Sequence, residues 1–143
     1  MPIAQAQTFL KATSALIAAV GLVVALAAHP QTAGLAALLV DIIYWPYDGA
    51  PTLTSPATRL SSAIAGGVMV GWGAMLWLIA TRLLPVEPVL AATIVRTGAI
   101  AWFTIDSLGS WLAGAPLNIA LNLLFLAALL WPVSQLRPMQ PSR

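Results

Sequence analysis

The sequence predicts an all-α integral membrane protein, a four-transmembrane-helix bundle with a short interfacial or re-entrant outer segment. The first indication of a membrane protein is the composition, because 60% of the 143 residues are hydrophobic and only 7% are charged. In soluble domains about a quarter of the residues are charged. Six basic and four acidic side chains cannot cover a water-soluble protein of this size. We therefore expect one membrane domain that comprises residues 1–143.

The lengths of the apolar segments predict the number of helices that cross the membrane. A spanning helix needs about 20 mostly apolar residues, because the hydrocarbon core is about 30 Å thick. Proline stands near the ends of the segments that qualify, as expected at the start of a helix or just beyond its end. The four predicted spans are residues 9–28, 58–84, 88–113 and 116–134. Because short turns join the last three spans, we expect these three to form a compact up-down bundle.

The outer segment, residues 29–57, contains a fifth apolar run at residues 33–45. This run is short, carries Asp41 and leads into the turn-forming sequence Pro46-Tyr47-Asp48-Gly49. An apolar run of 10–14 residues is more typical of an interfacial or re-entrant segment than of a span. We therefore expect residues 33–45 to lie at the membrane surface or to dip into it.

The distribution of positive charge favours four spans over five. With four spans and a cytoplasmic N-terminus, Arg59 is the one basic residue that lies outside, and the cytoplasmic side holds Lys11, Arg82, Arg137 and Arg143. Five spans would leave only Lys11 and Arg59 inside. Because cytoplasmic loops carry an excess of Lys and Arg, we expect both termini in the cytoplasm. We also expect the first helix to be retained rather than cleaved as a signal peptide.

The second predicted span carries small residues at four-residue spacing: Ala63, Gly67 and Gly71. Small residues at this spacing create a flat seam that another helix can approach closely. The pattern is common in membrane helices. We expect the seam to pack against another helix of this chain, and the alternative is a docking face for a neighbouring subunit or a second copy.

The last two predicted spans carry polar residues at matching depths. Asp106 lies near the middle of the bilayer, where a charge costs at least about 2.5–3.5 kcal/mol. A turn centred near residues 114–115 would place Asp106 opposite Asn122 and Ser110 opposite Asn118 in an antiparallel hairpin. This polar cluster would either fix the helix register through hydrogen bonds or form a site for a proton or a polar ligand.

The remaining candidate residues are isolated. Arg96 is close enough to the inner surface for its side chain to reach lipid headgroups, so we expect a phosphate anchor. Trp72 and Trp102 lie at mid-helix depths, where they would pack in the core or contact a pigment or quinone ring. The chain has one histidine and no cysteine, and no nucleophile–base pair is apparent. No catalytic residue, metal site or cofactor is therefore predicted.

The order of these segments resembles that of small bacterial four-helix inner-membrane proteins with a DoxX-like layout. One helix is followed by a proline-marked outer segment, a glycine-rich helix opened by arginine, and a final helical hairpin. Short stretches also resemble an uncharacterised bacterial group, namely Trp45-Pro46-Tyr47-Asp48-Gly49, Thr58-Arg59-Leu60 and Asp106-Ser107-x-Gly109-Ser110 with Gly114-Ala115-Pro116-Leu117-Asn118. The resemblance covers residues 8–134 and implies a bacterial inner membrane, but it implies no activity.

Two classes of function remain. The first is a non-enzymatic accessory or scaffold subunit of a larger inner-membrane assembly, for example of respiratory or photosynthetic type, with the bilayer and other membrane subunits or a second copy as partners. The alternative is a protein that binds a lipid or quinone, or conducts protons, through Asp106, Asn118 and Asn122. A membrane enzyme acting on lipid is a third hypothesis. The scattered basic residues form no stripe, so we expect no nucleic-acid partner.

Overall fold

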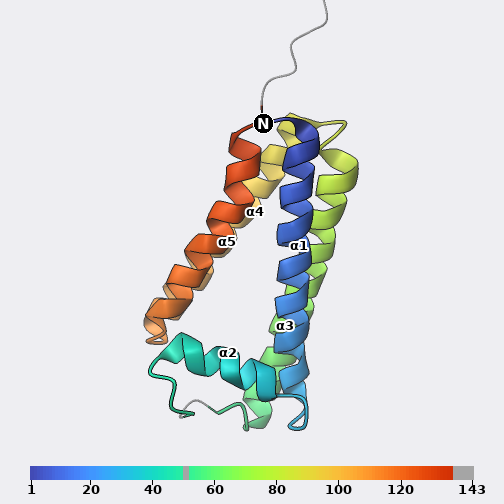
Figure 1. Ribbon diagram of the computed structural model, residues 1–143. Coiled ribbons are helices and arrows are strands. Elements are labelled where there is room, and N and C mark those ends of the chain that lie inside the picture. The colour runs from blue at the N-terminus through green and yellow to red at the C-terminus, as the bar shows by residue number, and fades with distance from the viewer. Residues whose placement is uncertain (50–51, 137–143) are drawn as a thin grey trace, which may run out of the picture.

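The computed structural model describes residues 1–49 and 52–136 (Figure 1). It confirms the all-α prediction, because these residues form helices and contain no strand. The order is α1 (Ile3–Ala25), η1 (Leu26–Ala28), α2 (Gly34–Tyr44), α3 (Pro56–Leu78), η2 (Ile79–Leu83), α4 (Pro88–Leu112) and α5 (Pro116–Ser134). Four helical segments in this described part are long and apolar enough to cross a membrane. The chain is thus a multi-pass membrane protein.

Local signals in the sequence determine where α3 begins and where α4 ends. The Ser55 side chain caps α3 by accepting a hydrogen bond from the backbone N–H of Thr58 at 3.0 Å. Proline occupies the first position of α3, where its missing N–H costs no helical hydrogen bond. Gly114 follows α4 with a φ of 72°, a left-handed conformation that ends a helix without strain when the residue is glycine.

The first helix is longer than its apolar run predicts. It begins at Ile3 rather than near residue 9, so its first turns contain polar residues. One of them, Gln7, donates a side-chain hydrogen bond to the backbone oxygen of Ala80 at 3.0 Å. Ala80 belongs to η2, a π-helical turn that continues α3. Apolar length therefore predicts the part of a helix that lies in hydrocarbon, not the point where the helix begins.

The short helix α2 accounts for the apolar run at residues 33–45. It has 11 residues, and a helix of that length is only about 16 Å long, so it cannot cross the hydrocarbon core. In Figure 1 it lies across the end of the bundle that is remote from the N-terminus. The expectation of a non-spanning segment agrees with this placement.

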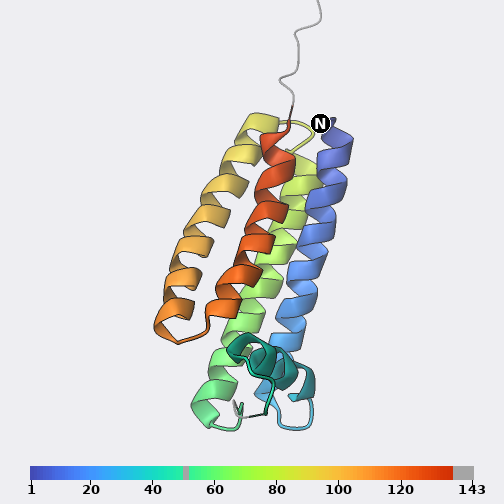
Figure 2. The ribbon, with the colours of Figure 1, turned by 60° about the vertical axis from the view of Figure 1, so that its left-hand side comes forward.

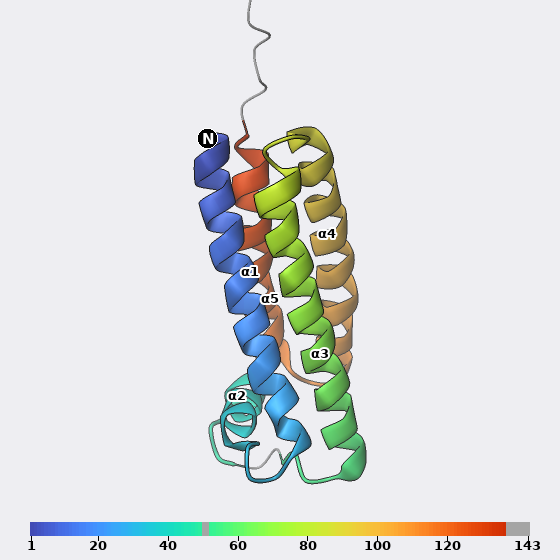
Figure 3. The same cartoon turned by 90° about the vertical axis from the view of Figure 1, so that its right-hand side faces the viewer.

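The helices associate as two pairs. Figure 3 shows α1 running alongside α3, and Figure 2 shows α4 alongside α5. Glycine lets α1 and α3 touch through their backbones. A Cβ added to Gly66 would lie 2.3 Å from the backbone nitrogen of Ala25, and one added to Gly73 would lie 2.8 Å from the backbone oxygen of Ser14. This close approach makes α1 the principal partner of α3.

This pairing corrects one sequence expectation. We expected the second, third and fourth spans to form a compact bundle of their own, because short turns make consecutive helices neighbours. The structure instead packs α3 along α1, and α3 meets α4 mainly near the turn that joins them. A tight turn brings only helix ends together, and the glycines of α1 and α3 determine which helix α3 follows along its length.

The two pairs meet at one end of the molecule and separate toward the other (Figure 1). The meeting end contains the buried apolar core, which includes Leu10, Leu84 and Leu129. There the rings of Phe9 and Trp131 make an edge contact with centroids 4.9 Å apart. The N-terminal amine of Met1 also donates a hydrogen bond to the backbone oxygen of Gln135. Both ends of the described chain therefore lie on the same side, as an even number of crossings requires.

Candidate functional site

The structure brings together Asp106, Ser110 and Asn118, three of the four residues of the predicted polar cluster. Ser110 lies one turn beyond Asp106 on α4, and its Oγ donates to Asp106 Oδ1 at 3.2 Å. Asn118 reaches across from α5, so that its Nδ2 lies 3.2 Å from Asp106 Oδ1 and 2.8 Å from Ser110 Oγ. These contacts hold the α4–α5 hairpin in register and surround the Asp106 carboxylate with donors.

Asn122, the fourth residue, has a different partner from the one expected. Its Nδ2 donates to Ser107 Oγ at 3.4 Å, not to Asp106. The hairpin register is close to that derived from the turn, but helical rotation places Ser107 rather than Asp106 nearest to Asn122. Ser107 was not among the predicted cluster residues, although the same pairing rule, applied to the neighbouring residue of α4, places it opposite Asn122.

Trp102 is the second addition to the cluster. Its indole Nε1 donates to Asp106 Oδ2 at 3.1 Å, one turn away on α4. Its ring also contacts Trp72 of α3, with centroids 5.3 Å apart and an interplanar angle of 45°. The two tryptophans thus connect the helix pairs across the space that separates them. Asp106 receives hydrogen bonds on both carboxylate oxygens.

A cavity of about 720 Å³ lies between the two helix pairs. Thirteen of its sixteen lining residues are apolar, and the three polar ones are Asp106, Asn118 and Asn122. Leu39 and Ile43 of α2 belong to the lining, so α2 closes the end where the pairs are furthest apart. Trp72 and Trp102 line the same space. The polar cluster therefore forms part of a cavity wall and is not enclosed between α4 and α5.

The cavity opens between α3 and α4. Val68 on α3 lines it and is nevertheless 66% exposed, and the lining residues Ala65 and Gly98 are exposed as well. These three residues lie near the middle of their helices. In a spanning helix that position corresponds to the hydrocarbon core. A molecule dissolved in the bilayer would reach the cavity from the side.

The predicted packing seam does not lie between helices of this chain. A Cβ added to Gly67 or Gly71 would meet nothing within 4 Å, and both residues are exposed. The glycines that contact α1 are Gly66 and Gly73, which share a face because they are seven residues apart. A rotation of about 100° per residue turns Gly67 away from that face. Of the predicted seam of Ala63, Gly67 and Gly71, the two glycines therefore do not pack against another helix of this chain.

Arg96 has a protein partner that the sequence did not predict. Its Nη2 donates to the backbone oxygen of Val133 at 2.9 Å. Val133 belongs to the last turn of α5, where carbonyl groups lack helical partners and the helix dipole favours a cation. The guanidinium thus ties the start of α4 to the end of α5 at the side that carries the N-terminus.

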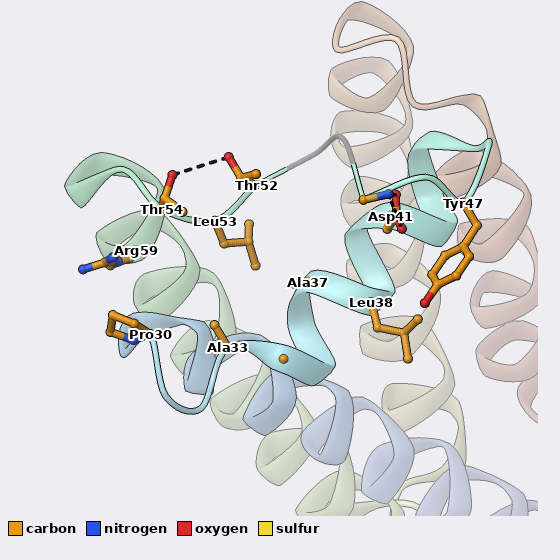
Figure 4. A pocket seen from close by; sticks show the side chains of 12 residues that line it. Pro30, Ala33, Ala37, Leu38, Asp41, Tyr47, Thr52, Leu53, Thr54 and Arg59 are labelled. Carbon is orange, nitrogen blue, oxygen red and sulfur yellow. Dashed lines mark hydrogen bonds between the residues drawn. The ribbon is translucent and has the colours of Figure 1, made fainter.

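A second pocket, of about 460 Å³, lies at the α2 end of the molecule, between α2 and the segment that follows it (Figure 4). Asp41 is 5% exposed, and its carboxylate accepts hydrogen bonds from the backbone N–H of Asp48 and Gly49. Figure 4 shows Arg59 at the opposite end of the pocket from Asp41. Asp41 therefore anchors the chain that leaves α2, which gives this carboxylate a structural role.

Comparison of the chain with protein-family models, with curated proteins and with solved structures found no match. Within residues 1–49 and 52–136, no group of three or more His, Cys, Asp or Glu side chains is placed to hold a metal ion. The function must therefore be inferred from the site itself. The site is defined by the cavity and by its single carboxylate.

Proposed function

We propose that this protein binds a small amphipathic molecule within the membrane, in the cavity between its two helix pairs. The observation that carries the proposal is the combination of a large apolar cavity with one localised polar wall. Its volume of about 720 Å³ falls within the 300–1,000 Å³ typical of small-molecule sites. Such sites combine apolar walls with a few convergent polar groups. Asp106, Asn118 and Asn122 are these polar groups here.

A purely structural role accounts less well for the cluster. Hydrogen bonds that only join two helices need no open space beside them, and each contributes about 0.6–2 kcal/mol. Here the polar residues face a cavity that also reaches the lipid between α3 and α4. An ionisable residue within the membrane that faces a cavity is a functional candidate by default. These features favour a lipid- or quinone-sized ligand that enters from the bilayer.

A second proposal, an accessory or scaffold subunit of a larger membrane assembly, is supported by a different observation. Gly67 and Gly71 lie on an exposed face of α3, with open space around both. Exposed small residues at this spacing allow the close approach of another helix. The two proposals are compatible, because the cavity and this face involve different residues.

For the location, we propose a bacterial inner membrane with both termini in the cytoplasm. The meeting end of the helix pairs carries Lys11, Arg82 and Arg96, whereas the end near α2 carries Arg59. The excess of basic residues marks the meeting end as cytoplasmic. The DoxX-like layout supports a bacterial membrane. Arg137 and Arg143, which strengthen the charge asymmetry, lie outside the described residues.

Blocking the cavity tests the binding function. Gly98 lines the cavity, and a Cβ added there meets nothing within 4 Å, so Gly98→Leu would place a side chain at the cavity mouth without moving a helix. Gly67→Leu is the matched control, since Gly67 has equally open surroundings but lies outside the cavity lining. Native mass spectrometry of protein extracted from its own membranes in mild detergent would reveal the bound molecule.

The wild type and Gly67→Leu should retain a bound amphiphile that Gly98→Leu lacks. A wild type that carries no bound mass, or a Gly98→Leu variant that carries the same one, would contradict the binding function.

For the subunit role the expectation is reversed, because Gly67→Leu should release a co-purifying membrane protein that Gly98→Leu retains. A wild type that migrates as a monomer without partners would exclude that role.

A further inference from the structure

We infer that the ligand is a lipophilic amine, that is, a molecule with an apolar body and a positively charged, hydrogen-bond-donating head. The inference rests on the proposed binding function and specifies its ligand class. It distinguishes such an amine from a quinone, which offers only acceptor oxygens. Three features of the cavity wall support it: donors that are already engaged, acceptors that are open, and a carboxylate that lacks a counter-ion in the lining.

The donors next to Asp106 are engaged within the cluster. Trp102 Nε1 and Ser110 Oγ donate to the carboxylate, and Asn118 Nδ2 donates to both Asp106 and Ser110. A carboxylate only accepts hydrogen bonds, so the Asn118 amide must turn its NH₂ group toward it. A carbonyl oxygen of a ligand placed beside Asp106 would have to displace one of these bonds to gain a donor there, whereas the Nδ2 of Asn122, which donates to Ser107 alone, keeps a second N–H.

The acceptors, in contrast, are open. Within residues 1–49 and 52–136, Arg59 Nε is the one buried side-chain polar atom without a hydrogen-bond partner. The hydrogen bonds of Asn118 and Asn122 all use Nδ2, and none uses the amide oxygen. A fully buried amide oxygen without a partner would belong to the same class as Arg59 Nε, and neither of these two oxygens does, so each keeps some exposed surface. Asn118 is half-buried and Asn122 is 4% exposed, and both line the cavity, so these oxygens belong to the polar wall that a bound donor would meet.

The charge of the wall favours a cation. The lining contains Asp106 and no basic residue. Of the basic side chains nearest along the bundle, Arg96 donates to Val133 and Lys11 lies 5.5 Å from the centroid of the Trp77 ring. A charge at this depth is costly, and a ligand ammonium would supply the missing counter-charge. Trp72 and Trp102 add ring faces that attract cations.

A series of four probes separates charge from hydrogen-bond donation. Binding to the full chain in phosphatidylcholine nanodiscs, corrected for empty discs, is measured for dodecylammonium, dodecyltrimethylammonium, dodecanol and a decyl-substituted quinone. The first has charge and N–H donors, the second charge alone, the third a neutral donor, and the fourth only acceptors. Dodecylammonium should bind at least about tenfold more tightly than the quinone, as one charge-assisted hydrogen bond implies, with the other two between them.

Single-residue variants test whether the polar residues of the cavity wall cause the preference for dodecylammonium. Asp106→Asn should weaken dodecylammonium binding about tenfold and change dodecanol binding less than about twofold. Glu87→Gln, which removes an exposed carboxylate outside the cavity lining, should change neither. Asn122→Leu removes one open acceptor and leaves the bonds to Asp106 in place, so it tests the inference even if Asp106→Asn fails to fold. It should weaken dodecylammonium binding about threefold.

The outcomes separate the inference from the function on which it rests. Tighter binding of the quinone or of dodecanol than of dodecylammonium would overturn the inference and leave the binding function in place. Dodecylammonium binding that Asp106→Asn and Asn122→Leu leave unchanged would also overturn it. If none of the four probes binds above empty discs, the binding function itself fails.

Discussion

The two helices of each pair are held together by a different kind of contact in each case. Between α1 and α3, Gly21, Gly66 and Gly73 allow backbone contact, and a Cβ at any of them would lie within 3 Å of an atom of the other helix. Between α4 and α5, the contacts include hydrogen bonds from Asn118 and Asn122. In lipid, close packing and hydrogen bonds replace the hydrophobic effect as the source of helix association.

This difference indicates how the fold can hold a cavity. The glycine-lined pair packs tightly, with its two backbones in contact. The hydrogen-bonded pair presents its polar residues to the space between the pairs, where a ligand can use them. The buried apolar core joins the pairs at one end and α2 closes the other, so the middle remains open.

The largest expected effect comes from breaking the glycine contact. Gly66→Ala would place a Cβ 2.3 Å from the Ala25 nitrogen, so α1 and α3 must move apart. We expect the free energy of unfolding to fall by about 2–3 kcal/mol, the cost of overpacking. Titration with sodium dodecyl sulfate in mixed micelles, followed by circular dichroism, measures it. Gly67→Ala is the control and should change stability by less than about 0.5 kcal/mol.

An intermediate effect is expected from the hydrogen-bonded pair. Asn118→Leu removes donors from Asp106 and Ser110, and leaving them underpaired should cost about 1–2 kcal/mol in the same titration. Asn122→Leu, which removes only a 3.4 Å bond to Ser107, should cost less than about 0.6 kcal/mol. Equal losses for the two variants would show that Asp106 is not the centre of the cluster.

The smallest expected effect concerns the tryptophan bond. Trp102→Phe keeps an aromatic ring against Trp72 but removes the N–H donor to Asp106 Oδ2. The stability should fall by about 0.6 kcal/mol, the average for a hydrogen bond within a membrane protein. A double-mutant cycle with Asp106→Asn would isolate this bond. A loss above about 2 kcal/mol would instead indicate that ring packing holds the pairs apart.

The sequence predicted the parts of the fold that depend on segment length and on turns. Apolar length predicted the four spans, and the shortness of the 33–45 run predicted that it would not cross. The turn near residues 114–115 predicted that Ser110 lies opposite Asn118, and the structure joins these two residues by a hydrogen bond. The predicted placement of Asp106 opposite Asn122 differs from the structure, in which Asp106 contacts Asn118 and Asn122 contacts Ser107. The predictions that succeed each depend on residues that are close along the chain.

Features that depend on packing between distant segments could not be predicted from the sequence. Gly66 and Gly67 are adjacent glycines in the same helix, yet only Gly66 faces α1. The four-residue spacing therefore selected the wrong face, and no local signal identifies the partner helix. The cavity was likewise not predicted, because its walls come from α1, α2, α3, α4 and α5 together. Trp72 and Trp102 were noted by depth alone, and their contact depends on the separation of the pairs.

The most direct test of the central claim is a crystal structure of the protein grown in a lipidic mesophase, purified without stripping its native lipids. The claim is that the space between the helix pairs is a binding cavity. We predict elongated density beside Trp72, Trp102 and Asp106, with Val68 and Gly98 apart at the mouth. Val68 packed onto Gly98, with Asp106 enclosed between α4 and α5 and no space beside it, would contradict the account.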